Sequence, residues 1–555
     1  MPRKTKIGFK QSLSLFILSF FLFQIIFPFA YSLSSYGFNG KTFSVSSPIP
    51  LPRAIGASLH FQGELENDFE PESTGFGKGN FGWTRTCNFI WIFMEPEQGN
   101  FSVIDDPNAY PNVFIQNMKK IDTKILALLD TVPYWLNEST TWYVAPENRN
   151  LFFNYVNQTV SNYQNDVAIW EIINEPNNVW GKFKGTWDEY LAVLIGSAET
   201  IKRINASIDI LVGGLGGTRE LEFLDYIMKN LTSTPSNVPG FATAKDLFIG
   251  IAFHPYLEPA ENLVVKLKEY DEVLKKYNWT TRDGARHWIT EIGGSTESEK
   301  EQLNPLIVDY QREFASLVMK QVAIALSWRV EGFNIWTYRD FEDPGKYNQI
   351  YAHCGVVFAN GSWKPVMHGL NWSNRYLANG FTELVPFEAT HPITGIAVKD
   401  TRIINGTQRW AFVLWNSQSK MPVQVRLSFT KSVSFAQRSD FQSANTWNLD
   451  RYAGNRSLKL SIDYEPILIV VDTAIGAIPQ LEIVSDGFHV FLLISLSSGI
   501  SLGIIIALKQ KSINIKDAKG ANDKKDAKGA KGAKDTKDAK DAKDANDIKE
   551  AEKNE

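Results

Sequence analysis

The sequence predicts an α/β fold: a (β/α)8 barrel, or TIM barrel, followed by a β-sandwich. Three observations lead to this prediction. Apolar runs of strand length recur along the first two thirds of the chain, segments with helical periodicity separate them, and alternating strands without intervening helices follow. For the end of the 555-residue chain, the prediction adds one transmembrane helix and a disordered tail.

Eight apolar runs supply the strands of the barrel. Their starts lie about 30 to 45 residues apart, the length of one strand plus a returning helix and its loops. Most are nearly continuous in Val, Ile, Leu, Phe and Trp, as expected for strands buried on both faces. The runs are RAIGASLHF from Arg53, GWTRTCNFIWIF from Gly82, KILALLD from Lys124, VAIWEIINEP from Val167, IDILVGGLGG from Ile208, FIGIAFHPY from Phe248, HWITEIGG from His287 and GFNIWTY from Gly332.

Segments between the runs have the spacing of amphipathic helices. Apolar residues repeat with helical periodicity from Asp188 to Ile204, behind a capping box of Thr186 and Glu189. A second stripe runs from Leu263 to Tyr277, and a third helix is predicted from Pro305 to Trp328. A doubly wound open sheet is the alternative. No glycine-rich phosphate loop follows the first run, which favours the barrel.

The two ends of the chain differ in composition from its middle. Basic residues precede an apolar stretch at the N-terminus, which is typical of a secretory signal, and Phe488 to Leu508 contains no charged residue. A low-complexity tract of Lys, Asp, Ala and Gly follows. The predicted order is a signal peptide at 1–32, the barrel at 33–377, the β-sandwich at 378–475, a linker at 476–487, the transmembrane helix at 488–508 and a charged cytoplasmic tail at 509–555.

Composition excludes several classes of protein. With 57 Lys and Arg against 61 Asp and Glu, the chain lacks the basic excess that nucleic-acid binding needs. The 44% hydrophobic content excludes wholesale disorder. Two cysteines exclude a disulfide-stapled scaffold and a cysteine zinc cluster, although one bridge between Cys87 and Cys354 stays open.

Ten Asn-x-Ser/Thr sequons lie between the two hydrophobic ends, and none lies in the tail. Their confinement agrees with an outward-facing domain that carries N-linked glycans. We therefore expect a single-pass membrane protein at the cell surface with its barrel outside. The glycosylation candidates are Asn100, Asn137, Asn157, Asn205, Asn230, Asn278, Asn360, Asn371, Asn405 and Asn455.

Two glutamates stand at the carboxyl ends of predicted strands, where a barrel presents its functional residues. Glu175 follows the fourth run, and Glu291 lies near the end of the seventh. A glutamate that finishes a buried apolar strand costs free energy unless it is paired or used. Together they predict a catalytic carboxylate pair.

From about His60 to Leu377 the sequence resembles the retaining glycoside hydrolases of clan A, with a barrel similar to family 39 or family 5 and an appended β-domain. The strand-four signature of the clan matches Asn174-Glu175-Pro176, and its strand-seven nucleophile matches Glu291. The other matches are Arg85 in the second run, Trp91 and the loop after it, His254-Pro255-Tyr256 in the sixth run and Trp336 in the eighth.

The resemblance implies retaining hydrolysis of β-linked O-glycosidic bonds by double displacement. Glu291 would attack the anomeric carbon and Glu175 would serve as acid and then base, with their carboxyl groups about 5 to 5.5 Å apart. The charge of Glu291 would favour the protonated form of Glu175. The reaction needs no metal or organic cofactor, and the partner is an oligo- or polysaccharide.

Supporting roles follow from the same resemblance. Arg85 would keep Glu291 ionised, with a buried pair to Glu171 as the alternative, and Asn174 would donate to the sugar 2-hydroxyl. Tyr256 would orient Glu291. His254 would bind sugar or position a carboxylate, or else is a satisfied core histidine. Side chains expected to shape the cleft are His60, Trp135, Trp180 and Trp336, and Glu95 and Asp130 are expected to anchor loops.

A rival hypothesis is a cell-surface carbohydrate-binding or adhesion protein on a catalytically inactive barrel. The sequons, the hydrophobic ends and the aromatic residues fit it equally, whereas the two glutamates within their motifs favour an enzyme. Transglycosylation through the same intermediate is a further alternative. The sugar, the linkage and the position of cleavage stay open.

Overall fold

The structure is a computed structural model of the whole chain, divided into two compact units, Met1–Lys509 and Gln510–Glu555. The barrel and the sandwich both lie in the first unit. The structure describes residues 48–59, 75–136, 143–178, 183, 185–217, 219–257, 259–294, 310–341, 353–386, 393–443, 445–449, 452–485, 488–493 and 506–510. The predicted signal peptide and nearly all of the predicted tail lie outside these residues.

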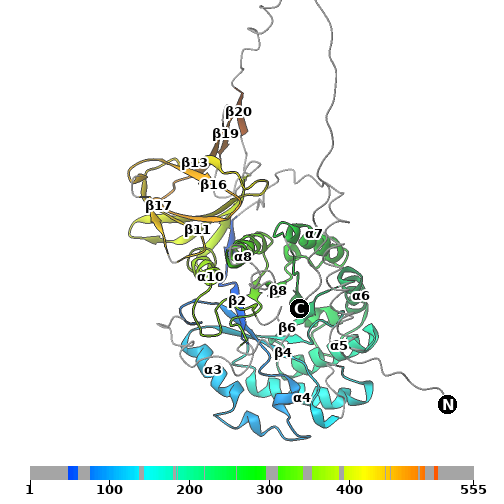
Figure 1. Cartoon of the computed structure of the whole chain (residues 1–555). Coiled ribbons are helices and arrows are strands. Elements are labelled where there is room, and N and C mark those ends of the chain that lie inside the picture. The colour runs from blue at the N-terminus through cyan, green and yellow to red at the C-terminus, as the bar shows by residue number, and fades with distance from the viewer. Residues whose placement is uncertain are drawn as a thin grey trace, which may run out of the picture. The chain divides into compact units, whose positions relative to one another are not determined.

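Eight parallel strands close into a barrel, as predicted, which excludes the open sheet (Figure 1). The first strand pairs with the last, with Ile55 opposite Phe333. All eight predicted runs contribute one strand each. The strands are β2 (Ile55–Leu59), β3 (Trp83–Thr86), β4 (Lys124–Leu129), β5 (Ile169–Ile172), β6 (Asp209–Leu215), β7 (Gly250–Phe253), β8 (Trp288–Ile292) and β9 (Gly332–Ile335).

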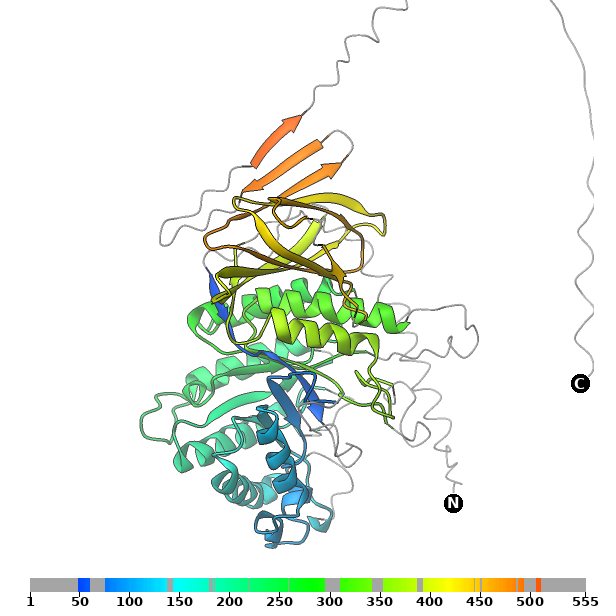
Figure 2. The ribbon, with the colours of Figure 1, turned by 90° about the vertical axis from the view of Figure 1, so that its left-hand side faces the viewer.

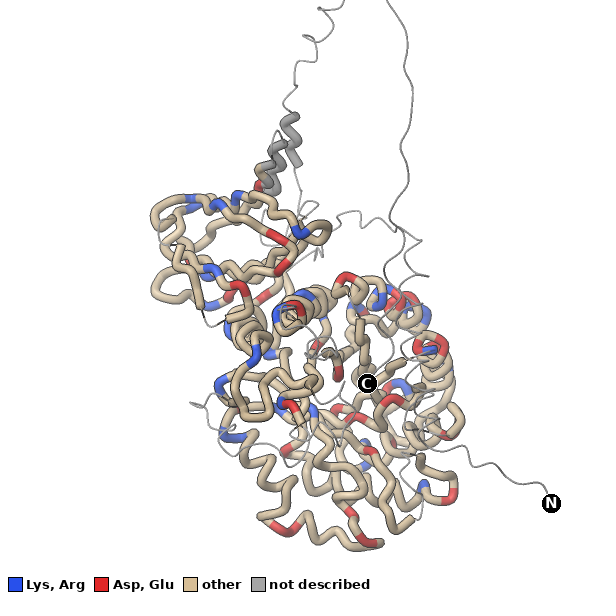
Figure 3. Tube along the Cα trace, in the orientation of Figure 1, with Lys and Arg blue, Asp and Glu red and all other residues tan. Residues whose placement is uncertain are grey.

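Helices return the chain between the strands and cover the outside of the barrel. The predicted capping box is present at α5, where Thr186 accepts from the Glu189 amide and Glu189 accepts from the Thr186 amide. Acidic and basic residues are interspersed along the outer helices (Figure 3). The helices are α2 (Trp91–Met94), α3 (Tyr110–Lys120), α4 (Arg149–Tyr163), α5 (Trp187–Ile204), α6 (Glu220–Ser233), α7 (Asn262–Lys275), α8 (Tyr310–Ser327) and α10 (Pro365–Tyr376).

A small apolar cluster fills the barrel interior near the amino ends of the strands. Trp83 and Trp288 meet edge to face there, with ring centroids 4.6 Å apart. Because side chains two positions apart share a face of a strand, Arg85 follows Trp83 on the inner face toward the carboxyl end. The filled floor leaves the carboxyl ends of the strands as the place for a site.

Two antiparallel sheets form the domain after the barrel. Helices α8 and α10 lie side by side (Figure 2). The first sheet runs in the order β1-β10-β11-β12-β17-β14-β15 and the second in the order β16-β13-β18-β19-β20. Their strands are β1 (Ile49–Leu51), β10 (Thr382–Val385), β11 (Ile393–Ile404), β12 (Thr407–Asn416), β13 (Val423–Phe429), β14 (Val433–Ser439), β15 (Trp447–Asn448), β16 (Ser457–Ile462), β17 (Ile467–Ala474), β18 (Pro479–Ser485), β19 (Phe488–Leu493) and β20 (Ile506–Gln510).

Two domain boundaries differ from the prediction. Strand β1 pairs with β10, so the first sheet includes a segment that precedes the barrel. Strand β18 pairs with β13, so the second sheet continues into the segment expected to be a linker at 476–487. Leu481 and Ile483 alternate with Gln480 and Glu482, which is the pattern of a strand, although a linker was predicted here.

The helix predicted at 488–508 is not confirmed. Strand β19 pairs antiparallel with β18, and β20 belongs to the same sheet, while residues 494–505 lie outside the described part. Asp486 and Gly487 stand between β18 and β19 in the sequence, and an Asp-Gly pair between two apolar runs is a hairpin signal. Within the described residues, the structure has no helix with the length and apolar character of a membrane span.

Candidate active site

Arg85 connects the functional ends of three strands. From β3 its guanidinium donates to both carboxylate oxygens of Glu171, at 2.9 and 2.8 Å, and to Oε1 of Glu291 at 2.6 Å. It also donates to Oδ1 of Asn174 at 2.7 Å. The two alternatives for Arg85, a partner of Glu291 or a buried pair with Glu171, therefore both hold. One fully buried cation fixes the carboxylates of β5 and β8 relative to each other.

Glu291 is held by donors on both of its oxygens. Arg85 donates to Oε1, and the Tyr256 hydroxyl donates to Oε2 at 2.8 Å. Hydrogen bonds to a carboxylate favour its ionised form. About 9% of Glu291 stays exposed, enough for contact with a bound molecule. The residue therefore has the partners that a nucleophilic carboxylate requires.

Glu175 lies just past the end of β5 in a left-handed backbone conformation, with φ of 46°. Its amide donates to the Gly214 carbonyl at 2.9 Å, which ties this turn to β6. Oε1 is 3.0 Å from Nδ1 of His254, and Oε2 accepts from Asn178 at 3.0 Å. A left-handed residue at a site costs free energy that the surrounding structure must offset, as these bonds do.

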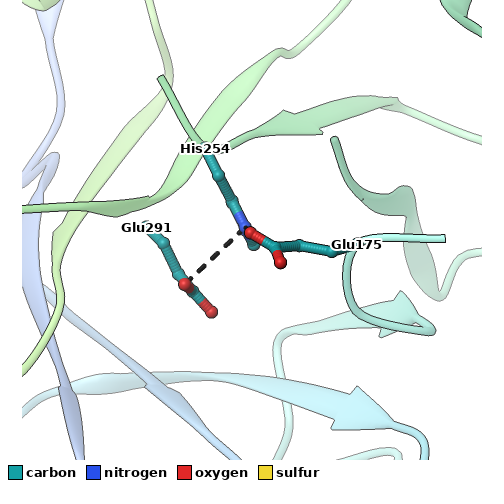
Figure 4. A group of neighbouring side chains, drawn as sticks. All are labelled: Glu175, His254 and Glu291. Atoms are coloured by element: carbon teal, nitrogen blue, oxygen red, sulfur yellow. Dashed lines mark hydrogen bonds and ion pairs between the residues drawn. The ribbon is translucent and has the colours of Figure 1, made fainter. Parts of the chain in front are cut away.

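His254 stands between the two glutamates (Figure 4). Its Nδ1 lies 3.0 Å from Glu175 Oε1 and 3.7 Å from Glu291 Oε2, and its Nε2 lies 3.0 Å from the Thr290 hydroxyl. One ligand atom from each of Glu175, His254 and Glu291 can be chosen so that all lie within 4.8 Å of one another. The two carboxylates therefore meet across the mouth of the barrel.

The charges of this group determine where a shared proton resides. Burial opposes a charge on His254, but the carboxylates of Glu291 and Glu175 outweigh burial and raise its pKa. Burial alone would raise the pKa of Glu175, but the hydrogen bond and charge of His254 outweigh it and lower that pKa. The charge of Glu291 acts on Glu175 in the expected direction. It is not the dominant effect, because His254 lies against Glu175 and lowers its pKa by more than Glu291 raises it. The predicted preference of Glu175 for its protonated form is therefore wrong for the free site.

Glycines of β6 make room for this arrangement. A Cβ on Gly214 would lie 2.1 Å from Nε2 of His254, and a Cβ on Gly216 would lie 2.5 Å from Oε1 of Glu175. Gly216 also receives a hydrogen bond at its carbonyl from Asn177 at 2.7 Å. Glycine in a strand often marks a close approach of another group. The run IDILVGGLGG contains this signal, which predicts a close approach of another group to the strand as well as the strand itself.

The predicted loop anchors Glu95 and Asp130 act as such. Glu95 accepts from Trp91 Nε1 at 2.6 Å and from the Gly99 amide at 2.7 Å. Asp130 accepts from the Thr131 amide at 2.6 Å and from the Asn174 amide at 3.2 Å. These bonds connect the loop after β4 to the Asn174-Glu175-Pro176 segment that follows β5.

Of the four side chains predicted to shape the cleft, the structure describes two, Trp135 and Trp336. Trp336 follows β9, and its amide donates to the Ile292 carbonyl at 2.8 Å, beside Glu291 in sequence. Trp135 packs edge to face on Trp91 and donates to the Glu95 carbonyl at 2.8 Å. His60 and Trp180 lie outside the described residues. Asn178, Thr290 and the β6 glycines belong to the site and were not predicted.

The group of Glu175, His254 and Glu291 is also the one cluster of metal-ligand residue types in the described part of the chain. Both oxygens of Glu291 already accept from protein donors, and both oxygens of Glu175 face His254 or Asn178. The cation of Arg85 lies against Glu291. This donor set fits proton transfer and nucleophilic attack better than the coordination of a cation.

Residues 112–331, less than half of the chain, match the profile of the cellulase family, glycosyl hydrolase family 5. Among similar solved structures, a family 39 glycoside hydrolase from Bacteroides cellulosilyticus WH2 has 17% identity and a TM-score of 0.56, over 76% of this chain and 81% of its own. The predicted resemblance to clan A glycoside hydrolases is confirmed.

Two further solved structures share the barrel fold. The catalytic domain of a family 30 xylanase C from Talaromyces cellulolyticus has 14% identity and a TM-score of 0.51, over 78% of this chain and 99% of its own. A family 51 α-L-arabinofuranosidase from Bifidobacterium longum has 12% identity and the same TM-score, over 78% and 97%. No curated protein matches the sequence. At these identities the structures show a common fold.

Proposed function

We propose that this chain is an extracellular retaining glycoside hydrolase that cleaves β-linked O-glycosidic bonds by double displacement. The observation that carries the proposal is the meeting of Glu175 and Glu291, with carboxylate oxygens within 4.8 Å. Retaining enzymes place the two carboxyl groups about 5 to 5.5 Å apart, whereas inverting enzymes separate them by about 6.5 to 9.5 Å to admit a water. The short separation favours retention.

Each residue of the site has a defined task in this reaction. Glu291 attacks the anomeric carbon, and a proton passes from Glu175 to the leaving oxygen as the bond to the sugar breaks. Glu175 then removes a proton from water, which displaces Glu291 from the glycosyl ester. A guanidinium can only donate hydrogen bonds, so Arg85 bonds to Oδ1 of Asn174 and not to its amide NH2. The NH2 group of Asn174 is therefore left to donate to the sugar 2-hydroxyl.

His254 supplies a second site for the proton that the first step consumes. Nδ1 lies at hydrogen-bond distance from Glu175 Oε1, so the proton can reside on the histidine and pass to Glu175 when the substrate needs it. Formation of the glycosyl ester removes the charge of Glu291. The proton has by then left with the leaving group, so Glu175 is ionised and serves as the base in the second step.

An extracellular location is part of the proposal. It is supported by the basic and apolar N-terminal segment and by the sequons. Among the described residues, the nine asparagines of these sequons are exposed or half-buried, as a glycan acceptor must be. Attachment through residues 488–508 stays a prediction, and membrane fractionation of cells expressing the full chain beside a chain truncated before residue 486 tests it.

The substrate class is proposed from the similar proteins only in broad terms. Two of them are a xylanase and an α-L-arabinofuranosidase, enzymes named for pentose-containing substrates. The panel of substrates therefore includes aryl β-xylosides, β-glucosides and β-mannosides, the corresponding polysaccharides and an aryl α-L-arabinofuranoside. Release of arabinose alone would contradict the β-linkage.

The decisive experiment compares wild type with Glu175→Gln and Glu291→Ala on this panel. We expect Glu175→Gln to lower kcat/KM by about 10²- to 10⁴-fold on substrates with poor leaving groups and less on activated aryl glycosides, which need little protonation. Glu291→Ala should lose at least about 10³-fold, and azide should restore turnover with an inverted product. Glu97→Gln, an exposed glutamate on the loop after α2, is the matched control.

The outcomes separate the hypotheses. Equal rates in wild type and both variants would remove the proposed function. Glycan binding without turnover by wild type would favour the inactive carbohydrate-binding protein. Product analysis with a sugar acceptor present would distinguish transglycosylation from hydrolysis.

A further inference from the structure

The aromatic side chains that the barrel leaves exposed lie just past the carboxyl ends of its strands. Among the described barrel residues they are Phe93 after β3, Tyr134 after β4 and Tyr256 after β7, with exposed fractions of 40%, 74% and 44%. Tyr256 is already explained by its bond to Glu291. Tyr134 is the most exposed of the three and has no role in the site described above.

The backbone that carries Tyr134 is fixed to the neighbouring helix. Trp91 and Ile92 of α2 donate their amides to the carbonyls of Asp130 and Thr131, at 2.8 and 3.2 Å. The next residue, Trp135, donates its indole NH to the Glu95 carbonyl at 2.8 Å and packs on Trp91. Tyr134 is therefore exposed on a corner segment whose backbone is held by hydrogen bonds to α2 and the loop after it.

The same corner is continuous with the catalytic segment. Asp130, which ends β4, accepts from the Asn174 amide at 3.2 Å, and the Ile173 amide donates to the Leu129 carbonyl at 3.0 Å. Tyr134 is four residues beyond Asp130 and so lies within about 14 Å of it along the chain. Because Tyr134 follows β4 and Glu175 follows the neighbouring strand β5, both lie on the carboxyl-end face of the barrel.

A fixed, exposed tyrosine suits one kind of ligand. Its ring offers an apolar face for the CH groups of a sugar, and its hydroxyl offers a hydrogen bond to a sugar hydroxyl. A chain of sugars that starts at the glutamates crosses this face as it leaves the barrel mouth, so the occupant of the corner is a further sugar of the same molecule.

We propose that Tyr134 forms a distal sugar-binding platform and that the substrate is therefore an oligo- or polysaccharide rather than the glycoside of a single sugar. This inference rests on the proposed function for the chemistry at Glu175 and Glu291. It adds a specificity-determining residue and a minimum length of substrate.

The test uses substrates of two lengths with the full chain. For Tyr134→Ala we expect kcat/KM on a β-linked hexasaccharide to fall about tenfold, mainly through KM, and to change less than about twofold on the aryl glycoside of the same sugar. Tyr134→Phe should retain most of the activity on the hexasaccharide. Trp447→Ala, which removes a 48% exposed aromatic residue of β15, is the matched control and should change neither value.

Binding is measured in parallel on Glu175→Gln protein by calorimetry, with hexasaccharides of xylose, glucose and mannose as probes. Weaker binding of a hexasaccharide on adding Tyr134→Ala supports the platform, even where wild type cleaves nothing and the proposed function fails. Equal losses on short and long substrates would assign Tyr134 a structural role and overturn the proposal. Cleavage and binding that do not depend on Tyr134 would overturn it while leaving the proposed function intact.

Discussion

At the scale of single residues, the site is organised by two groups that each contact both functional strands. Arg85 bonds to Glu171 of β5 and Glu291 of β8, and His254 lies within 3.7 Å of both Glu175 and Glu291. The arginine carries a permanent charge, whereas the histidine can gain and lose a proton near neutral pH. The first therefore fixes geometry and the second adjusts charge.

The shared proton gives a pH prediction for His254→Asn. In wild type the proton resides on either His254 or Glu175, so the pair releases it at a higher pH than Glu175 would with a neutral neighbour. The raised pKa of His254 and the lowered pKa of Glu175 show that the histidine form dominates. Removing the histidine removes that form, and the alkaline limb of the kcat/KM profile should move to lower pH.

The measurement is a pH profile of kcat/KM on an aryl glycoside, with unfolding curves to confirm that His254→Asn folds. Tyr256→Phe is the comparison, because it removes a donor to Glu291 and no titrating partner of Glu175. An alkaline limb that stays in place in His254→Asn would show that Glu175 alone carries the proton.

The sequence predicted the residues of this site that belong to a motif or close a strand, and missed those defined by side-chain geometry. Glu175, Glu291 and Arg85 could be found because barrel topology brings strand ends together. Asn178 and Thr290 could not, since each acts through one hydrogen bond whose partner lies on another turn or strand. His254 fits between the glutamates because Gly214 and Gly216 of β6 have no side chains.

At the scale of elements, β6 shows how a strand can serve a site by what it lacks. Gly213 faces backbone, because its Cβ would lie 1.9 Å from the Ile173 carbonyl oxygen. Gly214 and Gly216 face the side chains of His254 and Glu175. Gly213 is therefore needed for the packing of β6 against the turn after β5. Gly214 and Gly216 are needed for the positions of the His254 and Glu175 side chains.

This difference predicts different results for two alanine substitutions. Gly213→Ala should destabilise the fold by about 1–3 kcal/mol, since backbone must move to admit the methyl group. Gly216→Ala should leave the unfolding midpoint nearly unchanged, because the glutamate side chain can turn away, and should lower kcat by about 10²-fold by misplacing Glu175. Denaturant unfolding and kcat on one aryl glycoside measure both. A fall in stability in Gly216→Ala as large as in Gly213→Ala would contradict this account.

At the end of the chain, apolar length alone was insufficient to distinguish a helix from a strand. The apolar stretch from Phe488 satisfied the length rule for a membrane helix, but its first six residues pair with β18. Apolar content does not distinguish a strand from a helix, whereas an Asp-Gly pair in the sequence after an alternating run is a local signal that favours a hairpin.

At the scale of the whole molecule, a buried lysine connects the barrel helices with the sandwich. Lys320 of α8 lies 3.7 Å from Glu261, which precedes α7, and 3.3 Å from the ring centroid of Tyr464. Glu261 also accepts from Trp415 of β12 at 3.0 Å. An ammonium group in this position has lost most of its hydration. The contact therefore couples the packing of the two domains to the protonation of one side chain.

Stability should consequently rise with pH over a defined window. Burial lowers the pKa of Lys320 to about 8, with Glu261 opposing part of the shift, against 10.5 for an ordinary lysine. Between these values the unfolded chain binds more protons than the folded one, so the free energy of unfolding increases with pH, in total by about 3 kcal/mol. Lys320→Met lacks this group, so wild type should gain stability relative to the variant from pH 8 to 10.5 in urea unfolding. Parallel curves would show that Lys320 keeps its proton, and Lys275→Met at the exposed end of α7 should run parallel to wild type.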